Sequence, residues 1–334
     1  MSTLAVVFEQ PQQLALKRLA LSAAGPADCV VDIAFSGIST GTERLLWTGR
    51  MPPFPGLGYP LVPGYESVGE VVSAGAESGR LVGELVFVPG ARCYSEVAGL
   101  FGGAAARVVA PGARLVPLPA HLTRTAATDA DTTAPGSAQG VLLALAATAY
   151  HALANQRAPD LIVGHGVLGR LLARVAIATS AGSPEGSQAE PPVVWETNPQ
   201  RAAGALGYDV LDPAQDQRRD YRAIYDVSGD AGLLDTLIAH LAPGGEICLA
   251  GFYEAPLSFN FPPAFMRELR LRVAAEFRES DLAAVVALID AGQLSLDGLI
   301  THRYPAAAAA DAYGTAFGDP TCLKLILDWS GTHA

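Results

Sequence analysis

Six consecutive residues, from Gly164 to Gly169, have the composition and spacing of a phosphate-binding turn. They read Gly-His-Gly-Val-Leu-Gly, follow the apolar run 161–163 and begin a helical pattern that extends to residue 180. In such a turn the first glycine permits the tight bend, the second lets a pyrophosphate approach, and the third lets helix and strand pack closely. Unpaired N–H groups and the helix dipole then stabilise the phosphate charge. The segment predicts a dinucleotide-binding site; the alternative is an ordinary glycine-rich connection.

An acidic residue, Glu196, ends the next apolar run, 193–196. It lies further along the chain than the ~20 residues that usually separate the glycines from the acid that binds ribose. The polar stretch 181–192 accounts for the extra length. A carboxylate here accepts hydrogen bonds from ribose hydroxyls and repels a 2′-phosphate, which favours NAD over NADP. Two alternatives stay open: a solvated glutamate that caps the next helix, and an NADP site that uses Arg201.

Strands alternate with helices around this turn, which is the pattern of a doubly wound parallel sheet. The expected strands are 161–163, 193–196, 208–211, 223–227 and 246–250, and the expected helices are 167–180, 199–207 and 231–241. The residues that we expect to contact NAD are Gly164, His165, Gly166, Val167, Leu168, Gly169, Glu196 and Ser228. Of these, His165 is expected to contribute backbone geometry only.

The first 120 residues have a different pattern. Short runs rich in valine and leucine, punctuated by glycine and proline, favour a compact and mostly antiparallel β domain. After residue 277 the chain returns to mixed helices and strands that we expect to complete this first domain. The predicted organisation is a β-rich domain of residues 1–149 and 277–334, a nucleotide domain of residues 150–276, and flexible insertions at 123–139 and 181–192.

Composition limits the class of protein. The chain has 334 residues, enough for two or three domains, and half of them are hydrophobic, which excludes global disorder. A net charge of −11 argues against a nucleic-acid binder, because no excess of cations is available to displace counterions from phosphates. Four separated cysteines without a CxxC pair argue against a disulfide framework or a structural zinc site. With no signal peptide or membrane span evident, we expect a soluble cytoplasmic protein.

Seven short motifs follow one another along nearly the whole chain. They are 36–43, 63–71, 82–87, 101–104, 147–153, 164–169 and 226–229. In content and order these motifs resemble the medium-chain dehydrogenase/reductase superfamily, to which alcohol dehydrogenases belong. The resemblance implies an α/β protein in which a GroES-like, β-rich catalytic domain binds the substrate and a Rossmann domain binds NAD.

Three positions depart from the zinc-dependent members of this superfamily. Where those members carry a cysteine, a histidine and a third cysteine or aspartate, this sequence has Ser39, Tyr65 and Ala144, and only the acid Glu66 is kept. A catalytic zinc needs three protein ligands and an open fourth position. The lobe of four cysteines that holds a structural zinc is also missing, since Cys93 stands alone. The resemblance therefore implies a dehydrogenase without a metal.

Four longer segments make the resemblance more specific. Segments 40–49, 54–67, 100–106 and 159–169 resemble the bacteriochlorophyllide dehydrogenases of bacteriochlorophyll biosynthesis. That family implies NAD-dependent oxidation of a 3-(1-hydroxyethyl) group on a bacteriochlorin, a tetrapyrrole, to a 3-acetyl group. Positive charge at the carbinol carbon can delocalise into the macrocycle, which lowers the demand for a Lewis acid and leaves a side chain to take the proton. The alternatives are a zinc-free NADPH-dependent quinone or enoyl reductase and a non-catalytic tetrapyrrole carrier.

The resemblance also places candidate catalytic residues at the reacting group. They are Tyr65, Glu66, Ser39 and Thr40. Tyr65 and Glu66 are the candidate proton acceptors, and the two hydroxyl residues are candidate hydrogen-bonding relays. Each has a structural alternative: Tyr65 as a packing aromatic in the former metal site, Glu66 as a buried structural acid, and the hydroxyls as turn residues. Glu43 is expected to pair with Arg44 or another cation.

Residues 47–63 are rich in aromatic side chains, methionine and proline and contain several glycine bends. Because a tetrapyrrole is wide, flat and mostly apolar, we expect this segment to form an aromatic lip over a broad cleft; the alternative is a loop that covers the core. The expected substrate contacts are Trp47, Arg50, Phe54 and Tyr59. Arg50 or Arg44 is available to pair with a propionate. The apolar segment 252–265 suits a contact between two copies, so we expect a homodimer.

Overall fold

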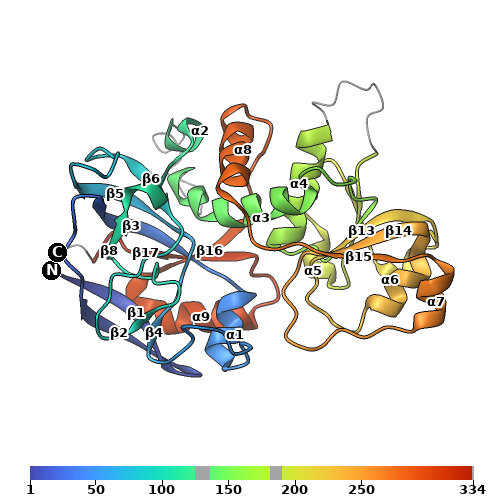
Figure 1. Cartoon of the computed structure of the whole chain (residues 1–334), viewed down its shortest axis with the longest axis horizontal. Helices are drawn as coiled ribbons and strands as arrows, with labels where there is room; N and C mark the ends of the chain where they lie inside the picture. The colour runs from blue at the N-terminus through green and yellow to red at the C-terminus, as the bar shows by residue number, and fades with distance from the viewer. Residues whose placement is uncertain (125–135, 181–189, 333–334) are drawn as a thin grey trace. The chain divides into compact units, whose positions relative to one another are not determined.

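The computed structural model of the chain describes residues 1–124, 136–180 and 190–332. Most of the two insertions expected at 123–139 and 181–192 therefore lies outside the described residues. Within the described ranges, no helix has both the length and the apolar character that a membrane span requires. Figure 1 shows the helices and strands in their order along the chain.

The chain divides into two compact units. Unit 1 consists of Met1–Ala144 together with Asp297–Ala334, and unit 2 consists of Leu145–Leu296. The sequence analysis placed the second boundary after residue 276. The structure places it later, because the helix α8 (Glu279–Asp290) belongs to unit 2. Its residue Asp281 accepts a hydrogen bond of 2.7 Å from the ring of His151 in the same unit.

Unit 1 is built on two β-sheets. The larger has seven strands in the order β16-β17-β3-β5-β6-β9, with β8 paired to β3, and the smaller has the order β2-β1-β4-β7. The larger sheet contains β3 (Asp28–Ile38), β5 (Ser67–Ala74), β6 (Leu85–Val88), β8 (Arg107–Pro111), β9 (Val116–Pro117), β16 (Ile300–Pro305) and β17 (Lys324–Asp328). The smaller contains β1 (Ser2–Gln10), β2 (Gln13–Ala20), β4 (Leu61–Val62) and β7 (Ala98–Gly99). Most pairs are antiparallel, as expected for this part of the chain.

The C-terminal segment completes unit 1. β17 runs antiparallel to β3, with Leu325 opposite Ile38. The helix α9 (Ala309–Gly318) packs against β16 and β17, and its Tyr313 ring meets Phe8 edge to face at 5.2 Å. The other helical segments described in this unit are α1 (Thr42–Thr48), α2 (Ala120–Arg124), η1 (Gly112–Arg114), η3 (Gly136–Leu142) and η5 (Ala306–Ala308). This return of the chain brings side chains from its two ends together beside the C-terminal end of β3.

Unit 2 has one sheet of six parallel strands in the order β12-β11-β10-β13-β14-β15. The strands are β10 (Leu161–Val163), β11 (Val193–Trp195), β12 (Asp209–Leu211), β13 (Tyr221–Asp226), β14 (Leu241–Leu249) and β15 (Arg270–Val273). Besides α8, the helical segments described in this unit are α3 (Leu143–Leu153), which begins at the unit boundary, α4 (Val167–Ser180), α5 (Pro199–Ala202), η4 (Pro213–Gln215), α6 (Leu234–His240) and α7 (Phe261–Met266). The predicted α/β class, with a doubly wound parallel sheet, is confirmed.

Three elements of unit 2 differ from the sequence prediction. The helix expected over 199–207 ends at Ala202, because Gly204 and Gly207 adopt left-handed backbone angles (φ +87° and +78°) that interrupt a helix. β14 begins at Leu241, where the end of a helix was expected. The edge strand β15 was not expected, although its four residues alternate arginine with apolar side chains as a half-buried strand does.

Candidate active site

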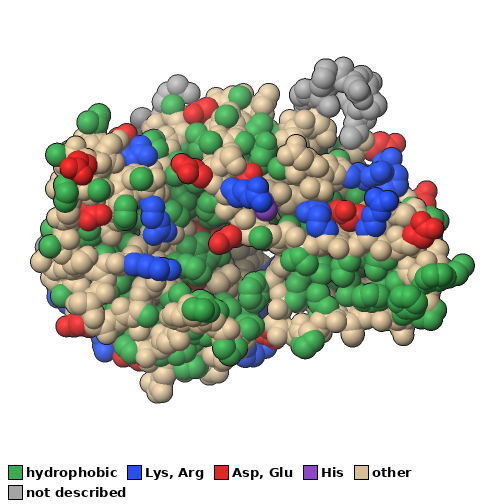
Figure 2. Space-filling model, viewed as in Figure 1, with side chains coloured by type: hydrophobic (Ala, Val, Ile, Leu, Met, Phe, Trp, Pro, Cys, Tyr) green, Lys and Arg blue, Asp and Glu red, His purple; other side chains and the backbone are tan. Residues whose placement is uncertain are grey.

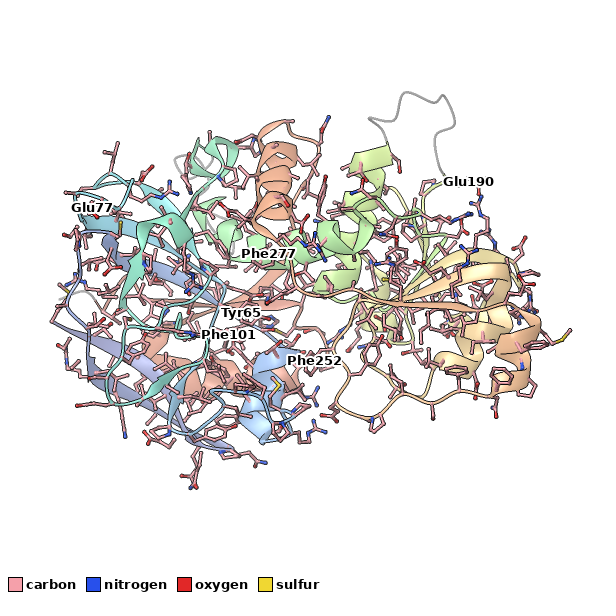
Figure 3. The ribbon with its side chains drawn as sticks, in the orientation of Figure 1. Tyr65, Glu77, Phe101, Glu190, Phe252 and Phe277 are labelled. Carbon is pink, nitrogen blue, oxygen red and sulfur yellow. The ribbon has the colours of Figure 1, made fainter. Side chains whose placement is uncertain are left out.

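Ser39 and Tyr65 bring two hydroxyl groups into contact at one end of the larger sheet of unit 1. Ser39 follows β3 directly and Tyr65 precedes β5, the antiparallel neighbour of β3. The Tyr65 hydroxyl donates a hydrogen bond of 2.7 Å to Ser39 Oγ. The ring of Tyr65 packs edge to face on Phe101, with 5.3 Å between centroids (Figure 3). Thr42, in the first turn of α1, also hydrogen-bonds Tyr65. The sequence analysis did not single out Thr42.

The protonation state of Tyr65 limits what it can do. Burial raises the pKa of Tyr65 above its ordinary value, and the nearby charge of Glu66 raises it further. The phenol therefore stays neutral at physiological pH, where it donates a hydrogen bond readily and accepts a proton poorly. Ser39 Oγ accepts this bond and keeps its own proton, so the pair presents a hydroxyl that can donate to a substrate oxygen.

Glu66 is held in a buried ion pair and not directed at a substrate. Its carboxylate accepts a hydrogen bond of 2.6 Å from Lys324 Nζ, and the two side chains are 0% and 2% exposed. Lys324 also donates to the carbonyl of Ile38 at 3.3 Å. A Cβ on Gly37 would lie 2.7 Å from the Glu66 carboxylate, so only glycine leaves room for the pair. These contacts favour the structural role for Glu66 over proton acceptance. No local motif marks Lys324, because β17 reaches β3 only through the fold.

Glu43 is a second buried acid of this site. Its carboxylate accepts a hydrogen bond from the Tyr313 hydroxyl at 2.7 Å and one from the backbone N–H of Ser39 at 3.2 Å. The expected pairing with Arg44 is wrong: Glu43 is fully buried, whereas Arg44 is exposed one position further along α1. Burial raises the pKa of Glu43 to about 8, the Tyr313 hydrogen bond lowers it, and the charge of Glu66 raises it. Glu43 thus fixes the backbone of Ser39.

The other predicted residues of unit 1 lie outside these contacts. Thr40 is exposed in the turn before α1, which fits the turn role weighed for it. Trp47 is half-buried and packs on Phe8 at 5.4 Å, and the hydroxyl of Tyr59 donates to the carbonyl of Leu46. Both are therefore tied to the core.

Two predicted substrate residues do face outward. Phe54 is 36% exposed, and Arg50 is exposed with its Nε hydrogen-bonded to Thr48 Oγ1 at 3.3 Å. Part of the expected aromatic lip thus covers the core, while Phe54 and Arg50 keep surface available to a ligand.

The residues at the position of the superfamily's catalytic zinc do not fit a zinc ion. Ser39 and Tyr65 offer neutral hydroxyls, and zinc in proteins is bound by thiolate, imidazole and carboxylate. The acid kept at these positions, Glu66, is already bound to the Lys324 ammonium, whose charge repels a second cation, and the neighbouring Glu43 already accepts hydrogen bonds from Tyr313 and the Ser39 backbone. Among the residues that the structure describes, no three histidine, cysteine, aspartate or glutamate side chains gather in a way that could hold a metal.

The glycine-rich turn of unit 2 has the geometry that a pyrophosphate needs. Gly164 follows β10 with a left-handed φ of +104°, and a Cβ on Gly166 would meet no atom within 4 Å. A Cβ on Gly169 would lie 1.8 Å from the Gly164 carbonyl oxygen, so only glycine lets α4 pack this closely. Val167 and Leu168 form the first turn of α4, and their N–H groups point to the same end. The turn therefore fits the phosphates of a dinucleotide.

Glu196 lies beside this turn, immediately after β11. Its two carboxylate oxygens accept backbone N–H bonds from His165 at 3.1 Å and from Asn198 at 2.8 Å. A carboxylate has about four acceptor positions, so Glu196 keeps the capacity to bind ribose hydroxyls. Ser228 lies across from Gly164 and donates to Asp226 at the end of β13.

The His165 side chain does more than the sequence suggested. Its ring nitrogens lie 2.7 Å from the carbonyl of Arg201 and 2.9 Å from the hydroxyl of Tyr208. Burial lowers the pKa of His165 to about 4, so the ring is neutral. Neutral imidazole has one donor and one acceptor, and these two contacts use both. The expectation of a purely backbone role is therefore wrong.

Comparison with known proteins agrees with this fold. Residues 25–120 match the family model of the alcohol dehydrogenase GroES-like domain. The chain is 55% identical over 332 residues to the 2-desacetyl-2-hydroxyethyl bacteriochlorophyllide A dehydrogenase of Rhodobacter capsulatus, covering 98% of this chain and 99% of the relative. It is 54% identical over 339 residues to the protein of that name from Cereibacter sphaeroides, covering 99% and 100%.

Solved structures share the whole fold at lower identity. The 2R,3R-butanediol dehydrogenase of Bacillus subtilis superposes with a TM-score of 0.78 at 19% identity, over 98% of this chain and 99% of that chain. An Escherichia coli alcohol dehydrogenase solved with NADH gives a TM-score of 0.76 at 19% identity, over 98% and 99%. The chain belongs to the medium-chain dehydrogenase/reductase superfamily and, within it, to the family of the bacteriochlorophyllide dehydrogenases.

Proposed function

We propose that this protein oxidises the 3-(1-hydroxyethyl) group of a bacteriochlorophyllide to a 3-acetyl group, a step of bacteriochlorophyll a biosynthesis, with NAD⁺ as the hydride acceptor. The observation that carries the proposal is the 55% identity, over nearly the whole chain, with a relative that bears this activity in its name. The Ser39–Tyr65 hydroxyl pair and the turn from Gly164 to Gly169 supply the two kinds of site that alcohol oxidation requires.

The residues of unit 1 bind and orient the reacting oxygen. The Ser39 hydroxyl donates to the alcohol oxygen, and Tyr65 holds Ser39 in place through the 2.7 Å bond. Glu43 fixes the Ser39 backbone from the other side. NAD⁺ bound at the glycine-rich turn would supply the acceptor for the hydride of the carbinol carbon. The hydroxyl proton is released to solvent water, and the macrocycle stabilises the developing charge at carbon, which reduces the need for a Lewis acid.

Two finer features are part of the proposal. NAD⁺ is the cofactor because the Glu196 carboxylate beside the turn repels a 2′-phosphate. Zinc is not required because Ser39 and Tyr65 offer only neutral hydroxyls, and Lys324 is bound to Glu66, the carboxylate that a metal would use. A cytoplasmic location stays a prediction from the sequence.

The test supplies purified protein with 3-hydroxyethyl bacteriochlorophyllide a and either NAD⁺ or NADP⁺. Reduced nicotinamide is followed by absorbance, and the acetyl product is identified by its loss of two hydrogens in mass spectrometry. We expect kcat/KM with NAD⁺ to exceed that with NADP⁺ at least tenfold, and exhaustive chelation to leave the rate unchanged. Loss of activity that zinc restores would contradict the metal-free mechanism.

The same assay separates the alternative functions. A protein that binds the pigment but forms no reduced nicotinamide is a carrier. A protein that oxidises NADPH with a quinone or enoyl substrate, and leaves the hydroxyethyl pigment unchanged, is a reductase. Either result would replace the proposed function.

A homodimer is also part of the proposal, formed through the edge strand β15. Its outer edge is unpaired within the described residues, and its Leu271 and Val273 are 43% and 72% exposed. The neighbouring helix α7 exposes Phe261 and Phe265 (68% and 66%), and Figure 2 shows apolar side chains gathered over this end of unit 2. An exposed apolar edge strand is a template for a second strand, and a two-fold axis pairs it with its own copy.

Sedimentation velocity tests this interface. We expect the wild type to sediment as a dimer at micromolar concentration and Val273→Glu to sediment as a monomer, because the charge would be buried at the pairing edge. Val82→Glu, at a valine of similar exposure in unit 1, is the matched control and should stay dimeric. A monomeric wild type, or a dimeric Val273→Glu variant, would reject this interface.

A further inference from the structure

Arg170 is a buried cation that neither the hydroxyl pair nor the glycine-rich turn uses directly. It is the first residue after the turn, on α4, and is 4% exposed. An arginine is rarely buried to this extent unless its five N–H donors are satisfied. Among the residues that the structure describes, its hydrogen-bond partners are backbone carbonyl oxygens and not carboxylates.

The guanidinium of Arg170 donates hydrogen bonds to four backbone carbonyl groups. Its Nε donates to the carbonyl of His165 at 3.1 Å, and its Nη1 donates to Gly204 at 3.2 Å. Its Nη2 donates to the carbonyls of Arg201 at 2.9 Å and Ala203 at 2.8 Å. The planar fork thus joins the glycine-rich turn to residues 201–204, which follow Glu196 along the chain.

Helical stability and core packing do little to position the segment that Arg170 holds. Its helix α5 is only four residues long and buries none of them, so neither helical stability nor core packing determines where it lies. α4 and α5 are neighbours in Figure 1, in keeping with these hydrogen bonds. The ring of His165 adds one further bond, to the same Arg201 carbonyl. A Cβ on Gly204 would lie 2.4 Å from Arg170 Nη1, so a larger residue here would displace the guanidinium.

We propose that Arg170 is the positioning residue that holds the segment 196–204 against the glycine-rich turn, and that it thereby sets the affinity and selectivity for the adenosine half of the cofactor. This inference rests on the proposed dinucleotide function. The Glu196 carboxylate accepts a hydrogen bond from the His165 N–H, and the chain that follows Glu196 is anchored by Arg170 through the Arg201 carbonyl. Arg170 therefore helps to determine where the Glu196 carboxylate lies. Arg170 does not touch the reacting atoms.

The test measures NAD⁺, NADP⁺ and AMP binding to Arg170→Lys by isothermal titration calorimetry. Lysine keeps the charge and loses the planar fork, so it separates positioning from simple electrostatics. We expect the Kd for NAD⁺ and for AMP to rise at least tenfold and the preference for NAD⁺ over NADP⁺ to fall at least threefold. The kcat at saturating NAD⁺ should stay within twofold of the wild type, because the reacting groups are unaffected.

The matched control is Arg80→Lys. Arg80 also holds backbone carbonyls, of Gly112 and Leu115, but in unit 1, so this variant should bind all three ligands as the wild type does. Should Arg170→Lys fail to fold, Gly204→Ala displaces the same contact locally and is expected to weaken AMP binding in the same way. Unchanged AMP and NAD⁺ affinity in the folded variant overturns this inference alone. A wild type that binds neither dinucleotide overturns the proposed cofactor as well.

Discussion

The two sites of this protein are built in different ways. The polar cluster of unit 1 (Ser39, Glu43, Tyr65, Glu66, Tyr313 and Lys324) consists of side chains from both ends of the chain, joined by hydrogen bonds and one buried ion pair. The turn of unit 2 is formed largely by backbone from one short stretch, Gly164 to Gly169. A backbone site requires glycines at fixed spacing, whereas a side-chain cluster can exchange its members while the fold is kept. This difference explains how a fold can retain its backbone turn while the members of a side-chain cluster change.

The strongest test of the unit 1 cluster is Lys324→Met. It leaves the fully buried carboxylate of Glu66 without its cation, and removal of one partner of a buried pair costs about 3–5 kcal/mol. Urea denaturation should show this loss in the free energy of unfolding. The double variant with Glu66→Gln should recover part of it. Lys17→Met, which breaks an exposed pair with Glu9, should cost under ~1 kcal/mol. A Lys324→Met protein as stable as the wild type would show that the pair does not hold the cluster.

The next largest effect concerns Glu43 and depends on pH. Its pKa in the folded protein, about 8, lies above its ordinary value of 4.5, so the folded state binds the proton more tightly than the unfolded state. The contribution of Glu43 protonation to the free energy of unfolding is fully present below pH 4.5 and is lost as the pH rises through 8. Glu43→Gln cannot ionise and escapes that loss. Relative to the wild type, we expect its free energy of unfolding to gain on the order of 3 kcal/mol between pH 5 and pH 8.5.

Urea titrations at the two pH values measure this gain. Glu77→Gln, at an exposed glutamate of the same unit, should show no such dependence. A constant difference between Glu43→Gln and the wild type across this range would mean that Glu43 is ionised throughout.

The difference between the backbone turn of unit 2 and the side-chain cluster of unit 1 also determines how much of each could be predicted from the sequence. The turn was predictable in detail because each glycine has a local reason: Gly164 needs a left-handed φ, and Gly169 needs close packing. The alternation of strands and helices likewise predicted the parallel sheet. The same local pattern, however, predicted a helix over 199–207 that is longer than α5, because the left-handed glycines that follow α5 were taken as part of the helix.

The unit 1 cluster was only half predictable. Ser39 and Tyr65 stood out through their departure from the zinc pattern, and the structure brings them together. Lys324 and Tyr313 lie more than 250 residues from their partners, a separation that no local motif can bridge. The ion pair of Lys324 changes the interpretation of Glu66 from a proton acceptor to a structural acid.

Within the cluster, Tyr65→Phe tests the step closest to the chemistry. It removes the hydroxyl that orients Ser39 and leaves the ring packed on Phe101. We expect kcat for the hydroxyethyl pigment to fall ~10²-fold, because Ser39 loses the hydrogen bond that holds its hydroxyl toward the reacting oxygen. The Kd for NAD⁺ should not change. Tyr304→Phe, which removes a hydroxyl bonded to Thr315, should leave kcat unaltered. Full activity in Tyr65→Phe would remove this residue from the mechanism.

The smallest effect is expected at Glu196, the one side chain on which the proposed choice between NAD⁺ and NADP⁺ at the backbone site of unit 2 depends. Glu196→Gln keeps the size of the residue and removes the charge that repels a 2′-phosphate. We expect the ratio of the Kd values for NADP⁺ and NAD⁺, measured by calorimetry, to fall about tenfold, while the turn still binds pyrophosphate through its backbone. Glu276→Gln, at an exposed glutamate of the same unit, should leave the ratio unchanged. An unaltered ratio in Glu196→Gln would mean that the backbone alone selects the cofactor, and the contrast between the two sites would then be sharper still.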